Sequence, residues 1–329
     1  MAQGFIEKYW PILGIPGTDA DAKVVSGDTQ LFYVNAAHAS ANDRNYGLDP
    51  TEPLATLQEL IDRSTGTSTI VAPALQAGDT IFIDGDITET VVVPVTVPAN
   101  CHLVGARPGI AAPVWTAATA PGIALTLQQD GWTVSGFRFT AGAAGTAIRL
   151  QLNAATGVGA NRTVIKDNYF DGAWVGLYGV ELVGAPFDVR IVGNEFREYR
   201  RGDSSAFALV TTNSAYANAY MCVVESNLFW ENENHVGSTG DNKGFNLTLF
   251  KNNTFHEGVL IAATRMLDLR GGSQGKNIVV NNNFCGDYSN TGGYYANAGA
   301  PGNWVGNFAE DVAEAEVADN GVTIAVPAA

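Results

Sequence analysis

The stretch Ile191-Val192-Gly193-Asn194-Glu195-Phe196 contains a pattern that recurs through the second half of this 329-residue chain. The pattern is an aliphatic or aromatic residue, two variable positions, an Asn, one variable position and a Phe. Its other copies end at Phe170, Phe229, Phe255 and Phe284, so successive Phe residues are 26, 33, 26 and 29 positions apart. One structural unit is therefore repeated.

A repeat of this length is typical of solenoid proteins, in which each unit is too short to bury a core alone. The apolar residues form short runs of Val, Ile, Leu and Phe between Gly- and Asn-rich breaks, which predicts β-strands. Parallel strands need a connection of a dozen or more residues, and such crossovers are nearly always right-handed. We therefore predict an all-β fold, a right-handed parallel β-helix solenoid.

Equivalent residues of stacked coils lie about 4.8 Å apart, so the pattern predicts an Asn ladder beside a stack of Phe rings. An Asn at a turn tolerates the left-handed backbone region and can bond the local backbone. We expect these residues to be structural: Asn168, Asn194, Asn227, Asn253, Asn282, Phe170, Phe196, Phe229, Phe255 and Phe284.

A short amphipathic helix is predicted near residues 53–63, after a strand at 32–35 and a loop rich in Asn, Asp and Gly. Its apolar residues share one helical face. Pro53 suits a first helical turn, and Thr51 is the expected N-cap. Such a helix would cap the open end of the solenoid.

Together, the repeat and this N-terminal segment resemble the right-handed parallel β-helix superfamily that holds pectate lyases, polygalacturonases and phage tailspikes. The resemblance covers roughly residues 30–308 and implies the fold, whereas many activities share that fold. The family's catalytic phrases, among them Asn-Thr-Asp, Asp-Asp, Gly-His-Gly and Arg-Ile-Lys, do not occur here. No catalytic residue can therefore be carried over.

Three regions are expected along the chain. Residues 1–29 form an apolar arm, residues 30–308 the β-helix, and residues 309–329 a C-terminal hairpin or cap around Asp319-Asn320-Gly321. An exposed apolar arm is a liability for a lone protein. The arm either folds back or docks on a partner, and we favour docking through Phe5, Tyr9, Trp10 and Ile12.

The net charge of -15 argues against a nucleic-acid groove, which needs clustered cations. No apolar run has the length of a membrane span, and residues 1–8 lack a secretory pattern, so we expect synthesis in a host cytoplasm. Cys101, Cys222 and Cys285 lack metal-ligand spacing. We expect neither a metal site nor a cofactor.

The sequence favours a structural role over catalysis. A glycosidase needs two carboxylates about 5 to 10 Å apart, and stacked coils would bring together carboxylates that follow each Phe. The weak candidates are Glu198, Glu231 and Glu257, with Asp171, Glu233 and Asp287 nearby. Aromatic residues near the same turn could make a saccharide platform: Tyr169, Tyr199, Trp230 and Tyr288. Arg197, Arg200 and Arg201 are predicted to lie on a solvated loop.

An acidic β-helix with an apolar arm and no recognisable active site most resembles phage or viral virion proteins. We predict a capsid decoration or head-spike protein, anchored to a virion shell protein by its arm. The alternative is a tailspike-like protein that binds or degrades a host surface glycan. Either role is compatible with a homotrimer.

Overall fold

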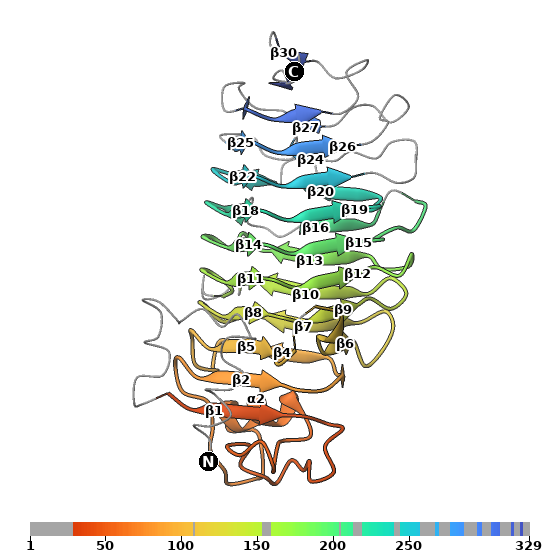
Figure 1. Ribbon diagram of the computed structural model, residues 1–329. Helices are drawn as coiled ribbons and strands as arrows, with labels where there is room; N and C mark the ends of the chain where they lie inside the picture. The colour runs from red at the N-terminus through yellow and green to blue at the C-terminus, as the bar shows by residue number, and fades with distance from the viewer. Residues whose placement is uncertain are drawn as a thin grey trace.

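The computed structural model describes residues 29–107, 109–152, 159–203, 205–212, 219–239, 244–256, 267–269, 277–285, 295–297, 304–309, 317–318 and 323–324. Three long parallel sheets run the length of the molecule, and the coils stack along one axis (Figure 1). Neighbouring strands within each sheet come from successive coils. The predicted parallel β-helix is confirmed.

Each coil contributes one strand to each sheet in turn. Sheet A contains β1 (Leu31–Val34), β2 (Thr80–Ile83), β5 (His102–Gly105), β8 (Thr133–Ser135), β11 (Val164–Lys166), β14 (Arg190–Val192), β18 (Val223–Glu225), β22 (Leu249–Lys251), β25 (Ile278–Val280) and β28 (Trp304–Val305). Sheet B contains β3 (Ile87–Thr88), β6 (Val114–Thr116), β9 (Arg138–Thr140), β12 (Tyr169–Asp171), β15 (Glu195–Arg197), β19 (Leu228–Trp230), β23 (Thr254–His256), β26 (Asn283–Cys285) and β29 (Phe308–Ala309). Sheet C contains β4 (Val91–Val93), β7 (Ile123–Leu127), β10 (Thr146–Gln151), β13 (Tyr178–Val183), β16 (Phe207–Thr212), β20 (Asn234–Ser238), β24 (Leu267–Leu269) and β27 (Tyr295–Asn297).

The remaining elements are short. Strands β17 (Ala219–Tyr220) and β21 (Phe245–Asn246) pair at the corner before sheet A, and a 3-10 turn, η2, covers Gly109–Ala111. The core lies inside the three sheets, because the middle residue of most three-residue strands points inward. In sheet A these inward residues are fully buried: Ile165, Ile191, Val224, Phe250 and Val279.

The Asn residues form a continuous hydrogen-bonded ladder at the corner between sheets A and B. Asn227 shows the repeating contact: its Nδ2 donates to Ile191 O at 2.9 Å and to Asn253 Oδ1 at 3.0 Å. The left-handed conformation, which we expected for the Asn, falls instead on the residue before it, for example Ser226 with φ 57°. This exchange occurs because each Asn side chain must point inward to reach the next coil.

The helix α2 (Leu57–Thr65) closes the N-terminal end of the stack (Figure 1). It begins later than predicted, because Leu54 pairs by backbone with Tyr33 and Asn35 beside β1. Its N-cap is Thr56, whose side chain accepts from Glu59 N. The amide and the hydroxyl of Thr51 instead donate hydrogen bonds to the Asp49 carboxylate.

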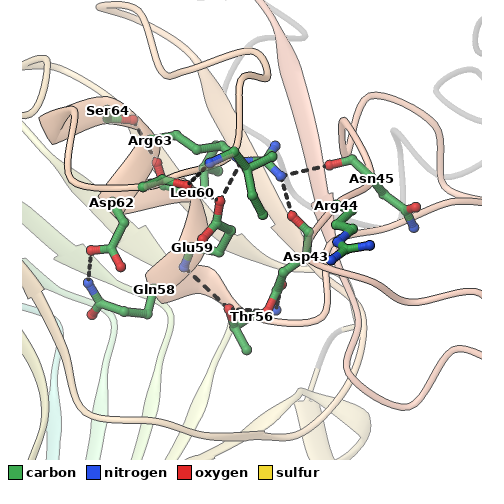
Figure 2. Close-up of polar contacts among 12 residues, drawn as sticks. Asp43, Arg44, Asn45, Thr56, Gln58, Glu59, Leu60, Asp62, Arg63 and Ser64 are labelled. Carbon is green, nitrogen blue, oxygen red and sulfur yellow. Dashed lines mark hydrogen bonds and ion pairs between the residues drawn. The ribbon is translucent and has the colours of Figure 1, made fainter.

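A half-buried polar cluster fixes this cap to the preceding loop (Figure 2). Asp43 accepts from Thr56 N at 2.8 Å, and the Arg63 guanidinium donates to Asn45 O at 2.9 Å and pairs with Glu59. The Glu89 carboxylate, from the first coil, accepts from the first two amides of the helix. Burial raises the pKa of Glu89, and the hydrogen bonds from those two amides lower it again in part.

The predicted C-terminal hairpin is also present. Strand β30 (Val317–Ala318) pairs antiparallel with β31 (Thr323–Ile324), and β31 lies near β28 and β29 of the last coil. The hairpin therefore lies at the opposite end of the stack from α2. Residues 1–28, which hold the predicted arm residues Phe5, Tyr9, Trp10 and Ile12, lie outside the described residues.

Candidate functional site

Sheet B has a strict inward and outward alternation, because side chains along a strand point to opposite faces. Its inward Phe rings stack with centroid distances of 4.5 Å between Phe170 and Phe196 and 5.0 Å between Phe196 and Phe229. The residues on either side of each Phe must therefore point outward. Sheet B thus carries two parallel rows of outward side chains, one before and one after the Phe stack.

The outward rows bring aromatic and cationic side chains into contact along the stack. The Arg197 guanidinium lies 5.7 Å from the Tyr169 ring and 5.4 Å from the Trp230 ring. Trp230 in turn stacks on His256 with centroids 4.2 Å apart and planes 6° from parallel. The Arg138 guanidinium also lies over the Tyr169 ring, 5.2 Å from its centroid. We call these five residues the sheet B strip.

Carboxylates hold the two arginines of the strip. Arg138 pairs with Asp171 at 3.0 Å, and Arg197 pairs with Glu195. The arginine side chains are still 38% and 37% exposed, so both groups remain open to a ligand. The strip therefore presents the outer edges of stacked aromatic and guanidinium groups, next to hydrogen-bond donors and acceptors whose charges largely cancel.

The candidate carboxylates Glu198 and Glu231 lie at one edge of this strip. They follow Arg197 and Trp230, which are register partners in adjacent coils, and both have left-handed backbones, with φ 59° and 51°. Partial burial, followed by the charges of Asp171 and Glu231, raises the pKa of Glu198. Glu257, the third candidate, lies outside the described residues.

Two neighbouring carboxylates, one of which holds its proton more tightly, are the basic requirement for general acid catalysis on a glycosidic bond. Equivalent positions in adjacent coils are about 4.8 Å apart, close to the separation in retaining enzymes. The catalytic role of Glu198 and Glu231 stays a prediction.

The predicted aromatic platform is only partly formed. Tyr169 and Trp230 point outward, but Tyr199 is fully buried, which raises its pKa well above the ordinary value. This corner of the coil turns inward, and the Tyr199 backbone amide donates a hydrogen bond to the buried Asn232 side chain. Tyr288 lies outside the described residues.

The arginines lie in places that differ from the solvated loop predicted for them. Arg197 belongs to β15 rather than to a loop, and Arg200 lies 5.1 Å from the Trp174 ring, which is 44% exposed. The signal was available, since Arg138, Tyr169, Arg197, Trp230 and His256 each directly precede or follow a Phe of the repeat or its Phe139 equivalent.

In the described part of the chain, no group of three His, Cys, Asp or Glu side chains is arranged to hold a metal ion. Within the same residues, α2 does not have the length or apolar character of a membrane-crossing helix.

Comparison with known proteins gives no family assignment. No family model matches the chain, and no curated protein does. The chain is similar to two solved structures of the tailspike protein of E. coli bacteriophage HK620. One is a mutant in complex with a pentasaccharide, with a TM-score of 0.46, 16% identity, and coverage of 88% of this chain and 68% of that chain. The other is a double mutant, with a TM-score of 0.39, 14% identity, and coverage of 87% and 68%.

Proposed function

We propose that this protein is a phage or viral virion protein that binds a surface saccharide along the sheet B strip. The observation that carries the proposal is the continuous contact among Tyr169, Arg197, Trp230 and His256 on the outside of one sheet. The chemistry of this surface suits a sugar chain better than it suits an apolar peptide or a polyanion.

The outer edges of the stacked rings offer apolar C–H surface to a sugar, and arginine and carboxylate groups bond the sugar hydroxyls. The strip spans five successive coils, so its four intervals extend over about 19 Å. A flat, elongated site of this kind fits several units of an extended polysaccharide. The chain's net charge of -15 would repel a strongly acidic glycan, which favours a neutral one.

The virion assignment rests on the resemblance of the repeat and the N-terminal segment to phage β-helix proteins. A stacked β-helix satisfies its backbone groups between coils, and a rigid projecting rod is what a surface-exposed particle protein requires. Within this proposal, the finer role is a capsid decoration or head-spike protein anchored by residues 1–29. A tailspike position is the alternative.

Replacing Trp230 with Ala should weaken binding of host-cell surface polysaccharide by about 5- to 30-fold, because the loss of the indole edge and of its stacking with Arg197 and His256 removes about 1 to 2 kcal/mol. Isothermal titration calorimetry measures the change. Tyr46→Ala is the matched control, since Tyr46 is an aromatic residue that is 61% exposed on the N-terminal loop. Equal affinity for both variants would exclude the strip as the binding site.

The same incubations distinguish binding from cleavage. We expect no new reducing ends, because the proposal requires recognition only. Release of reducing ends that stops in Glu198→Gln but continues in Trp230→Ala at saturating glycan would make the strip a hydrolase site, with Glu198 as the acid.

Removal of residues 1–29 should abolish co-sedimentation with virus particles while the β-helix stays folded, because β1 begins only at Leu31. Quantitative gels of sedimented particles give the copy number. Hundreds of full-length copies per particle indicate capsid decoration, and a handful indicate a tail position. Normal sedimentation of the shortened chain would show that the arm is not the anchor.

A further inference from the structure

The corner between β12 and β13 carries a tryptophan that is not part of the sheet B strip. Trp174 is 44% exposed and lies three residues after Asp171, where the chain leaves sheet B for sheet C. Trp115 and Trp132, by contrast, are fully buried, and their indole nitrogens donate hydrogen bonds to backbone carbonyls. Trp174 therefore does not belong to the core.

The turn that presents Trp174 has a conformation that favours other residues. Val175 N donates to Gly172 O at 3.0 Å, which closes a turn with Ala173 and Trp174 at its two central positions. Both central residues have left-handed backbones, with φ 48° and 62°. Turns of this kind are dominated by Gly, Asn and Asp, and a bulky residue there is an outlier. Such strain is found most often at binding and catalytic sites, which makes Trp174 a candidate for contact with a ligand.

Both neighbouring coils hold this turn in place. Ala144 N donates to Val175 O at 2.8 Å on one side, and Trp174 N donates to Glu198 O at 3.1 Å on the other. Gly172 packs so closely against the second of these coils that a Cβ at this position would lie 2.4 Å from Glu198 O. The turn is therefore a rigid support for the indole, and it lies beside a residue that directly follows the strip.

One face of the Trp174 ring is covered and the other is open. The Arg200 guanidinium lies over the ring, 5.1 Å from its centroid. Among the residues that the structure describes, no second ring or cation lies over Trp174, and no acceptor bonds its indole N–H. Trp230 differs, because Arg197 and His256 both lie over its ring. Trp174 can therefore receive the flat face of a ligand, whereas Trp230 presents its edge.

The polar groups around the ring can bond hydroxyls. No carboxylate within the described ranges pairs with Arg200, so its N–H groups can donate to a ligand. The Asp171 carboxylate accepts from Ala173 N at 2.9 Å and thus lies at the base of the same turn. Residues 171–174 and 197–200 together carry two arginines and two carboxylates. This local balance of charge suits a neutral ligand whose hydroxyls both donate and accept.

We infer that Trp174 and Arg200 form a stacking subsite for one neutral pyranose ring beside the sheet B strip. The inference rests on the proposed function, because the strip would bind the rest of the same saccharide. The C–H face of the sugar would stack on the open indole face, and its hydroxyls would bond Arg200 and Asp171. A protein partner fits less well, since hot spots lie within wide desolvated patches. The exposed large apolar residues described at this corner are Trp174 and Val175.

Trp174→Asn in the full-length chain tests the subsite, because Asn is well suited to a left-handed backbone and should leave the turn folded. Isothermal titration calorimetry with host-cell surface polysaccharide should show an affinity lowered by about tenfold, since the stacking surface is lost. The unfolding temperature should be unchanged or higher. Leu247→Asn is the matched control, since Leu247 also has a left-handed backbone, with φ 52°, and is 43% exposed at the corner before sheet A. It should bind as tightly as the unaltered chain.

Trp230→Ala separates this inference from the proposed function. If Trp230→Ala weakens binding and Trp174→Asn does not, the strip binds the saccharide and the subsite is wrong. If the unaltered chain does not bind, the proposed function and the subsite fall together.

Two further results would overturn the subsite alone. A lower unfolding temperature of Trp174→Asn would mean that the indole stabilises the turn. Loss of co-sedimentation with virus particles, at unchanged affinity for the polysaccharide, would assign Trp174 to a contact with a shell protein.

Discussion

Replacing Asn227 with Leu should lower the free energy of unfolding by about 2 to 6 kcal/mol, the largest effect that we expect from a single polar residue in the stack. The Asn227 Oδ1 accepts from the backbone and side-chain nitrogens of Asn194 at 2.9 and 3.1 Å. Its Nδ2 donates to Ile191 O and Asn253 Oδ1. Leu removes all four bonds and leaves the Asn194 amide and the Ile191 carbonyl without this buried partner, at about 1 to 3 kcal/mol each.

Asn283→Leu is the matched control, because the same chemical change falls on an exposed residue next to the ladder. We expect an effect within about 0.5 kcal/mol. Guanidinium unfolding followed by circular dichroism compares the two variants. Equal destabilisation would mean that the loss at position 227 reflects strand propensity and not the ladder.

The two-residue period of strands explains why much of the structure could be predicted from the sequence. A Phe fixed inward forces its neighbours outward, so the alignment of five Phe residues already placed Arg197 opposite Asp171 and Trp230. The contact between these side chains then follows from coil spacing alone. The register of the repeat therefore predicts the sheet B strip, in which Arg197 belongs to β15 and not to a loop.

Corners between sheets were less predictable, because the direction of a corner residue depends on the coil above it. Tyr199 resembles the outward aromatic residues in the sequence, yet Asn232 of the next coil binds its amide and the ring is buried. The helix start moved for the same kind of reason: Leu54 is held by β1, which lies about twenty residues earlier. Local propensity at Pro53 and Thr51 could not report a pairing with a distant strand.

The core contains a histidine whose position no repeat predicts. His235 points inward from β20, at the place where the three preceding coils have Ala147, Gly179 and Ala208. Its ring lies 6.0 Å from the rings of both Phe229 and Phe255. Its Nδ1 lies 3.1 Å from Asn232 Nδ2, so the neutral ring accepts a hydrogen bond there. Burial, with a smaller contribution from His256, lowers the pKa of His235 to about 3.

This shift makes stability depend on pH in a defined direction. The unfolded chain takes up a proton at His235 near the ordinary pKa of about 6.5, whereas the folded chain does so only near 3. The contribution is therefore fully present above about pH 6.5 and is lost as the pH falls toward 3. Over that range, linkage gives a loss on the order of 5 kcal/mol, at about 1.4 kcal/mol per pH unit.

His235→Phe should remove this slope, because Phe keeps the ring between Phe229 and Phe255 and carries no titratable group. We expect the unfolding free energy of the unaltered chain, minus that of His235→Phe, to be constant from pH 8 to 7. Below about pH 6.5 it should fall by about 1.4 kcal/mol per unit. Taking the difference cancels the titration of the carboxylates that both proteins share. If the stability curves of the two proteins are parallel down to pH 4, the folded chain protonates His235 at its ordinary pKa. The ring would then be accessible to solvent and not buried in the core.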